Sequence, residues 1–237
     1  MNQFSRTQLL LGKGSISSLQ EKHVIVFGIG GVGGYVAESL ARSGVGKISV
    51  VDNDLISETN INRQIIALHS TLGKKKTQVI KERLLDISPT IQVIEHDCFF
   101  LPENKNEFDF SQYDFVIDCV DTVTAKIAII QSATDANVPV ITCMGTGNKT
   151  DPMGFLISNI EKTSVCPLAK VMRHELKARG IKGVKCVYSK EIPKKIFIEE
   201  SLENKEKITR HPPASVCWTP AAAGFLLSSY VIQQLIN

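Results

Sequence analysis

The fold is decided by residues 24–34, Val-Ile-Val-Phe-Gly-Ile-Gly-Gly-Val-Gly-Gly. The four apolar residues Val24–Phe27 predict a buried strand, and the residues after the glycines have helical spacing. Gly28, Gly30 and Gly33 match the pattern G-x-G-x-x-G. In this pattern the first glycine allows a tight turn, the second lets the backbone approach phosphate, and the third allows the helix to pack closely on the strand.

The same stretch predicts an anion site. The free N–H groups of residues 31–33 lie at the positive end of the following helix dipole, and such helix starts bind phosphate. Asp52 is the next acidic residue at the end of a predicted strand, in position to bond a ribose hydroxyl. Alone, these features predict only a nucleotide site. An NAD-binding Rossmann domain, in an oxidoreductase or a redox-sensing module, is the common alternative.

Strand and helix patterns alternate along the first 150 residues. We expect further strands at 47–51, 92–94, 115–120 and 138–143, and helices at 74–87 and 126–136. This alternation predicts an α/β fold with a Rossmann-like, doubly wound, mainly parallel sheet and helices on both faces.

The pattern changes at residue 151, and we expect a small α+β extension over residues 151–237 that faces the substrate. Its predicted elements are strands at 155–160 and 184–189, a basic helix at 167–179, a mobile loop at about 191–213 and an apolar helix at 221–236. The last helix is short and interrupted by Ser and Gln, so a core helix is favoured over a membrane-surface anchor or a membrane span.

The composition is typical of a soluble globular protein, with 43% hydrophobic and 22% charged residues among 237. The polar start of the chain shows no signal-peptide pattern, and the six cysteines form no C-x-x-C pair. We therefore predict a cytoplasmic protein with reduced thiols, no zinc and no integral membrane segment. Peripheral membrane association stays open.

Basic residues concentrate in one segment. Residues 162–195 contain ten Lys or Arg and two acidic residues, a net charge of +8 in a chain whose total is +3. A solvated helix face would explain such a run, and so would a surface that follows a phosphate backbone.

Four short motifs follow the glycine turn in order: Asp52-x-Asp54, Asn60-x-x-Arg63-Gln64, Gly73-x-x-Lys76 and Asp118-Cys-x-Asp121. With the glycine turn they resemble the adenylating enzymes of the ThiF/MoeB/ubiquitin-activating superfamily over residues 4–150. The resemblance implies ATP in place of NAD, and adenylation of a carboxylate in place of hydride transfer. Such a reaction builds negative charge on phosphoryl oxygens, and cationic side chains around them stabilise it.

The resemblance also implies a role for each motif residue. Arg63, Lys76 and Asp121 would be catalytic, with Lys76 neutralising the α-phosphate and Asp121 binding Mg²⁺. Arg6 would reach across the interface of a homodimer to the partner's ATP. Two simpler explanations are a Lys76 that only solvates a helix start and an Asp121 that caps the following helix. The other residues implied in nucleotide binding are Gly28, Gly30, Gly31, Gly33, Asp52, Asp54, Asn60 and Gln64.

The second half resembles a narrower family. Residues 151–176 look like the tRNA threonylcarbamoyladenosine dehydratases, mainly through Lys162-Thr163 and Pro167-Leu-Ala-Lys170 with Arg173. Those enzymes use ATP to cyclise the threonylcarbamoyl group on adenosine 37 of tRNA. The alternative within the superfamily is an adenylyltransferase that activates the C-terminus of a ubiquitin-like or sulfur-carrier protein. If tRNA is the substrate, the candidate contacts are Lys162, Lys170, Arg173 and Lys177.

Cys217, just before the C-terminal helix, resembles the position of a reactive cysteine in some superfamily members. A dehydratase has no evident need for one, because the activated carboxyl and the urea that captures it belong to the same substrate. A catalytic or sulfur-relay role for Cys217 or Cys166, and with it a sulfur-transfer partner protein, stays an open prediction.

Overall fold

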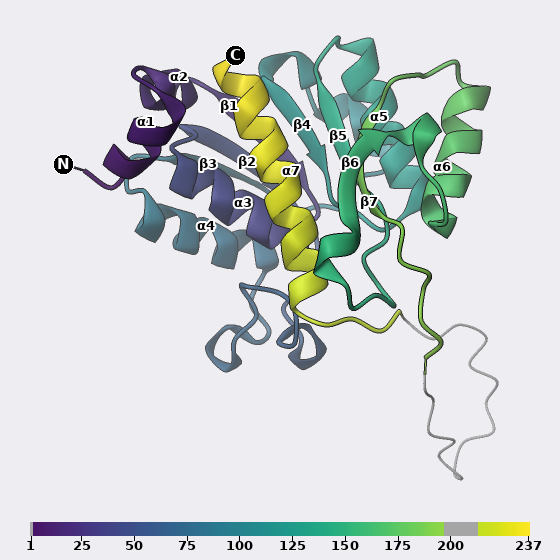
Figure 1. Ribbon diagram of the computed structural model, residues 1–237. Coiled ribbons are helices and arrows are strands. Elements are labelled where there is room, and N and C mark those ends of the chain that lie inside the picture. Colours follow the sequence, from purple (N-terminus) through teal and green to yellow (C-terminus); the bar gives the residue numbers. More distant parts are fainter. Residues whose placement is uncertain (1, 197–212) are drawn as a thin grey trace.

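The computed structural model describes residues 2–196 and 213–237. Seven strands form one sheet in the order β3-β2-β1-β4-β5-β7-β6 (Figure 1). Neighbouring strands are parallel, except that β6 runs antiparallel to β7. The predicted fold class is therefore confirmed. The strands are β1 His23–Phe27, β2 Lys47–Val51, β3 Gln92–His96, β4 Phe115–Asp118, β5 Val140–Cys143, β6 Phe155–Asn159 and β7 Lys185–Ser189.

Helices cover both faces of the sheet (Figure 1). One face carries α3 (Gly33–Ser43), α4 (Lys76–Ile87) and α7 (Trp218–Ile236), and the other carries α5 (Val123–Asp135) and α6 (Pro167–Ala178). Two short helices, α1 (Ser5–Leu11) and α2 (Ser15–Gln20), precede β1. Within the described ranges, no helix has the length and hydropathy that a membrane crossing requires.

Strand β1 lies inside the sheet and is covered on both faces, which explains why its sequence is continuously apolar. Val24 and Val26 pack toward α3 and α7, whereas Ile25 and Phe27 pack toward a group of aromatic rings on the other face. Because side chains alternate along a strand, a strand covered on both faces needs apolar residues at every position. The aromatic group consists of Phe100, Phe108, Phe110 and Tyr113.

The C-terminal helix α7 is a core helix, as predicted. Ala223, Leu227 and Val231 are fully buried in the same core as α3. At Gly224 a Cβ atom would lie 2.8 Å from the carbonyl oxygen of Val32, so the glycine allows α7 to cross close to the glycine turn.

Some predicted boundaries differ from the structure around β4. This strand ends at Asp118, two residues before the predicted end, because the Asp118 carboxylate accepts the N–H of Val120 at 3.1 Å and turns the chain. Helix α5 then begins at Val123, three residues earlier than predicted.

The two-part division at residue 150 stays a prediction. β7, from the second part, pairs with β5 in the same sheet. Most of the predicted mobile loop at about 191–213 lies outside the described residues.

Candidate functional site

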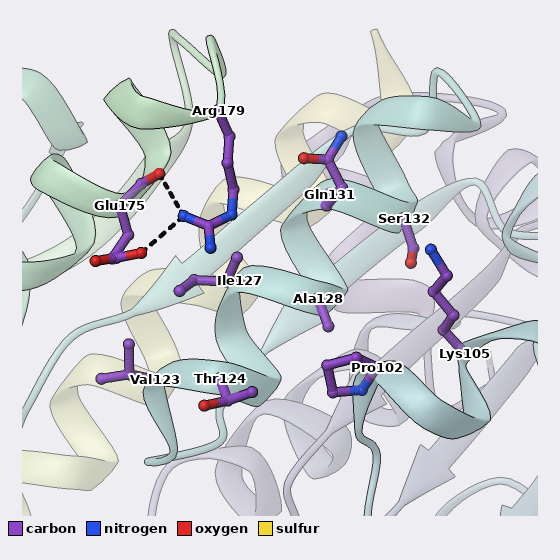
Figure 2. Close-up of a pocket in the computed structure, with 10 residues that line it drawn as sticks. All are labelled: Pro102, Lys105, Val123, Thr124, Ile127, Ala128, Gln131, Ser132, Glu175 and Arg179. Atoms are coloured by element: carbon purple, nitrogen blue, oxygen red, sulfur yellow. Dashed lines mark hydrogen bonds and ion pairs between the residues drawn. The ribbon is translucent and has the colours of Figure 1, made fainter.

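Two cavities of about 430 Å³ each stand out. One lies between α5, α6 and the 3₁₀ segment Pro102–Glu107 (Figure 2). It has an apolar floor, and its rim carries Lys105 and the ion pair between Glu175 and Arg179. None of the predicted site residues lines it. The other, which we name the sheet-edge cavity, lies at the carboxyl ends of β1, β2, β4 and β5.

The sheet-edge cavity is where the predicted motifs meet. In doubly wound folds, ligands bind at the carboxyl ends of the strands where the strand order reverses, which here is between β1 and β4. Motifs far apart in the sequence therefore converge, because parallel strands end at one edge of the sheet. The predicted residues that line the cavity are Gly28, Gly30, Gly31, Asp52, Asp54, Asn60, Arg63, Gln64, Lys76 and Asp121.

The glycine turn is shaped by close packing. Gly28 has a φ of +84°, and a Cβ there would lie 2.9 Å from the carbonyl oxygen of Cys119. At Gly33 a Cβ would lie 1.8 Å from the carbonyl oxygen of Gly28, so only glycine fits at the start of α3. Gly30 differs, because the nearest atom to its Cβ would be Nε2 of Gln64 at 3.9 Å. The space beside Gly30 is therefore open to a ligand.

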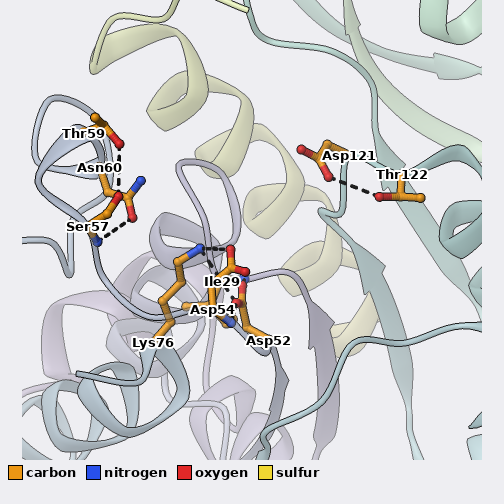
Figure 3. Close-up of polar contacts among 9 residues, drawn as sticks. All are labelled: Ile29, Asp52, Asp54, Ser57, Thr59, Asn60, Lys76, Asp121 and Thr122. Carbon is orange, nitrogen blue, oxygen red and sulfur yellow. Dashed lines mark hydrogen bonds and ion pairs between the residues drawn. The ribbon is translucent and has the colours of Figure 1, made fainter. Parts of the chain in front are cut away.

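Asp52 is fixed by the turn that it faces. Its Oδ2 accepts the N–H of Ile29 at 2.7 Å, and its Oδ1 accepts the N–H of Asp54 at 2.9 Å (Figure 3). Burial raises the pKa of Asp52, and the positive charge of Lys76 opposes this rise. Each carboxylate oxygen keeps a lone pair for a further donor, as a ribose hydroxyl would require.

Lys76 is the first residue of α4, and its side chain is buried although lysine usually snorkels to water. Its Nζ lies 2.6 Å from Oδ2 of Asp54 and 3.8 Å from Oδ1 of Asp52 (Figure 3). A lysine that merely solvates a helix start would point outward. The buried ammonium instead faces the cavity with two carboxylates beside it.

Three polar residues on the segment after β2 form the next wall. Oδ1 of Asn60 accepts the N–H of Ser57 at 3.1 Å, which leaves its amide nitrogen available (Figure 3). The Arg63 guanidinium donates to the carbonyl oxygen of Thr59 at 2.7 Å, which orients it. Gln64 is buried, and its Oε1 has no hydrogen-bond partner among the described residues. An unpaired acceptor in a binding cavity is expected where a ligand donates the missing hydrogen bond.

Asp121 lies on the opposite wall and is exposed. It does not cap α5, because Thr122 occupies the N-cap position and makes no side-chain capping bond. Among the residues that the structure describes, its carboxylate has one hydrogen bond, a long one of 3.5 Å that Oδ1 accepts from the Thr122 hydroxyl (Figure 3). A free carboxylate suits a hard cation such as Mg²⁺, which proteins often hold through one or two carboxylates together with substrate phosphates. In residues 2–196 and 213–237, no three His, Cys, Asp or Glu side chains converge as a metal cluster.

Other predicted residues lie outside this cavity in the described part of the chain. Arg6 is exposed on α1, and Cys217 is exposed at the N-cap of α7. Gly33 does not line the cavity, and it shapes the turn through its contact with the Gly28 carbonyl group. Arg173, on α6, donates to the carbonyl and hydroxyl oxygens of Thr163 at 2.9 and 2.5 Å. These bonds hold the segment before α6 against the helix. The other three basic candidates, Lys162, Lys170 and Lys177, are exposed.

Several wall residues of the cavity belong to none of the sequence motifs. Phe99 follows β3, and Met144 and Thr146 follow β5. Their position just beyond a strand end was the available signal, because the carboxyl edge of a parallel sheet forms the site. Two thiols, Cys119 and Cys143, also line the cavity, and burial raises the pKa of both, to about 12 for Cys143. Both thiols are therefore protonated at neutral pH.

Comparison with known proteins adds an independent finding. Residues 4–237 match the model of the ThiF family. The chain is 40% identical over 245 residues to the tRNA threonylcarbamoyladenosine dehydratase of Bacillus subtilis, which covers 100% of this chain and 96% of that protein. It is 37% identical to the Escherichia coli enzyme of the same name over 79% of this chain and 73% of that protein. The crystal structure of that E. coli enzyme, TcdA, in complex with ATP superimposes with a TM-score of 0.87 at 31% identity, over 99% of this chain and 93% of that chain.

The two glycines of the turn make separable predictions. Gly33→Ala places a methyl group against the Gly28 carbonyl, and we expect the free energy of unfolding to fall by about 3 kcal/mol because the contact cannot relax without moving α3. Gly30→Ala fits the fold but fills the ligand side, and we expect it to weaken ATP binding about tenfold or more at near-normal stability.

Chemical denaturation and calorimetric titration with ATP measure both effects. A Gly30→Ala protein that binds ATP as tightly as the wild type would remove the glycine turn from the ligand site.

Proposed function

This chain belongs to the ThiF family, and from that premise we propose that it is an ATP-dependent tRNA-modifying dehydratase. It adenylates the carboxylate of threonylcarbamoyladenosine at position 37 of tRNA and then closes the ring with loss of AMP. The observation that carries the proposal is likeness along the entire chain to an enzyme of that name, because the similarity includes the second half. A tRNA substrate is consistent with a cytoplasmic location.

The reaction has two steps. A carboxylate oxygen of the substrate attacks the α-phosphorus of ATP, and the bond to pyrophosphate breaks. The urea of the same substrate then attacks the acyl carbon, the bond to AMP breaks, and the ring closes. The carboxylate oxygen leaves with AMP, so the net change in the tRNA is loss of water.

The cavity side chains supply charge and position in the first step. Lys76 and Arg63 stabilise the negative charge that develops on the phosphoryl oxygens. Asp52 and Asp54 hold Lys76 in place beforehand, and Asp52 also bonds the ribose. The side-chain N–H groups of Asn60 and Gln64 donate to phosphate oxygens, while Oε1 of Gln64 accepts from another group of the ligand. Asp121 holds Mg²⁺, which neutralises phosphate charge when bound.

The function is tested by ATP–pyrophosphate exchange with tRNA that carries threonylcarbamoyladenosine. We expect exchange with this tRNA and none with unmodified tRNA. Lys76→Ala should lower the exchange rate by about 10²–10³-fold, because one preorganised electrostatic contact is lost. The matched control is Lys74→Ala, an exposed lysine of the same run, which should leave the rate unchanged.

Nucleoside mass spectrometry identifies the cyclised product. Exchange that depends on a ubiquitin-like carrier protein and not on tRNA would establish the alternative in this superfamily. Binding of NAD in preference to ATP would establish the oxidoreductase alternative.

The proposal includes a homodimer. On α1, Leu9 and Leu10 are each 86% exposed, close in sequence to Arg6. Such an apolar surface is better covered by a second copy of the chain than by water. In that arrangement Arg6 would complete the partner's nucleotide site.

A subunit-mixing experiment tests the role of Arg6. Arg6→Ala and Lys76→Ala homodimers should each be inactive, but their heterodimer contains one site with both residues. After equal mixing with random exchange, we expect about one quarter of wild-type activity, since half of the dimers are mixed and each has one intact site. Native mass spectrometry measures subunit exchange. Complete exchange without recovered activity would show that Arg6 does not act across the interface.

We also propose that the exposed lysines near α6 follow the tRNA backbone. Lys162 precedes α6, and Lys170 and Lys177 lie on it, two helical turns apart. Nη1 of Arg173 donates to Thr163, which orients the guanidinium, and Arg173 stays a candidate tRNA contact together with these lysines. Cys217 is exposed and would be accessible to a sulfur-transfer partner, which the proposed reaction does not require.

Removing two of these lysines should weaken tRNA binding and leave ATP binding unchanged. For Lys170→Ala with Lys177→Ala we expect a higher KM for tRNA, and a loss of about one unit of log–log salt slope per phosphate contact. The control is Lys81→Ala on α4, whose side chain pairs with Glu95. An unchanged salt slope would identify the α6 charges as a solvated face.

A further inference from the structure

Lys126 of α5 is a fully buried lysine that the sequence motifs do not include. Its Nζ donates to Oδ2 of Asp118 at 3.0 Å, to Oγ1 of Thr142 at 3.2 Å and to the carbonyl oxygen of Cys143 at 2.7 Å. The Thr142 hydroxyl in turn donates to Asp118. Every ammonium proton thus has an acceptor, and the one buried charge is balanced by the other.

This cluster joins the loops that follow the neighbouring strands β4 and β5, and both loops contribute to the sheet-edge cavity. Asp118 ends β4, and its Oδ1 accepts the N–H of Val120, within the loop that leads to Asp121. Cys143 ends β5, and its carbonyl group directly precedes the loop 144–147. Residues from both loops line the cavity. Lys126 therefore links the last residue of β4 to the last residue of β5, in addition to the backbone pairing of the two strands.

Stability alone is a weak reason for such a cluster. Two charges in a protein interior lose their hydration, and replacement of a buried ion pair by apolar residues is often neutral or stabilising. The ion pair instead supplies positional order, because one ammonium group with three acceptors restrains those three acceptor atoms relative to one another. Catalysis by positioning is sensitive to displacements of about 1 Å, which can cost about 10²-fold in rate.

We propose that Lys126 is a positioning residue of the adenylation site, which holds Asp121 at the correct distance from the loop after β5. This inference rests on the proposed function. Lys126 contacts neither the cavity nor a substrate atom, and it acts through Asp118 and the Cys143 carbonyl group.

The test is the double variant Asp118→Asn with Lys126→Met. It removes both charges together, keeps an amide oxygen for the N–H of Val120, and deletes the link to the Cys143 carbonyl. We expect kcat for tRNA-dependent exchange to fall about 10- to 100-fold, while the KM for ATP changes little. Asp118→Asn alone keeps the link to Cys143 and should lose much less of kcat.

The control is Ser49→Ala, which removes a buried hydrogen bond to His23 at 2.9 Å, away from the cavity. It should lower stability and leave kcat unchanged, which separates positioning from general destabilisation. A folded double variant with wild-type kcat would overturn the proposal. If the double variant does not fold, Asp118→Asn with Lys126→Gln keeps an uncharged polar pair, but the amide has only two N–H donors and cannot serve all three acceptors of the lysine. A folded Asn/Gln variant with wild-type kcat would overturn the proposal equally.

Hydrogen exchange provides a readout that does not depend on the reaction. In the double variant, amides of residues 119–121 and 144–147 should exchange faster than in the wild type, and Ser49→Ala should leave them unchanged. Unchanged exchange in both loops would overturn the proposal even if the enzyme is active. If the wild-type protein shows no tRNA-dependent ATP–pyrophosphate exchange, the proposed function is refuted instead.

Discussion

The structure depends on the contact between the glycine turn and the strands beside it. Because Gly33 has no side chain, the start of α3 rests against the Gly28 carbonyl group, where a Cβ would come within 1.8 Å. This contact fixes the path of residues 28–33, whose Gly28, Gly30 and Gly31 line the cavity, and the N–H of Ile29 in this turn donates to Asp52 at 2.7 Å. Asp52 then holds Lys76 near the same edge. A purely steric condition in the backbone thus sets the electrostatics of the site.

The carboxyl edge of the sheet concentrates buried charge. Lys76 is paired with Asp52 and Asp54, and Lys126 is paired with Asp118. The two pairs differ in use. The Asp54 side chain is 61% exposed, so its ion pair with Lys76 is open to solvent and can break at modest cost. The pair of Lys126 with Asp118 is fully buried and closed to ligands, which suits a fixed support.

Much of the fold could be predicted from sequence because apolar periodicity reports burial directly. The continuous apolar runs of β1 and β2 predicted both strands for this reason. The start of α5 was misplaced because the turn before it is made by the Asp118 side chain, which periodicity does not detect. The burial of Lys126 could not be predicted for a related reason. A lysine on a helix is expected to be solvated unless its partners, here on β4 and β5, are known. The motif residues converge in the cavity, but their individual roles depend on a ligand and stay predictions.

The second half of the chain contributes a wall to the sheet-edge cavity. Leu168 at the start of α6 and Pro220 at the start of α7 both line the cavity. The segment before α7 is bonded to the segment after β2, since the amide of Asn62 donates to the carbonyl oxygen of Ser215 at 3.1 Å. The α7 helix itself crosses the glycine turn closely because of Gly224. Both halves therefore contribute to one surface, and under the proposed function this surface would contact the nucleotide and the substrate together. This explains why likeness in residues 151–237 carries more information about the substrate than the glycine turn does.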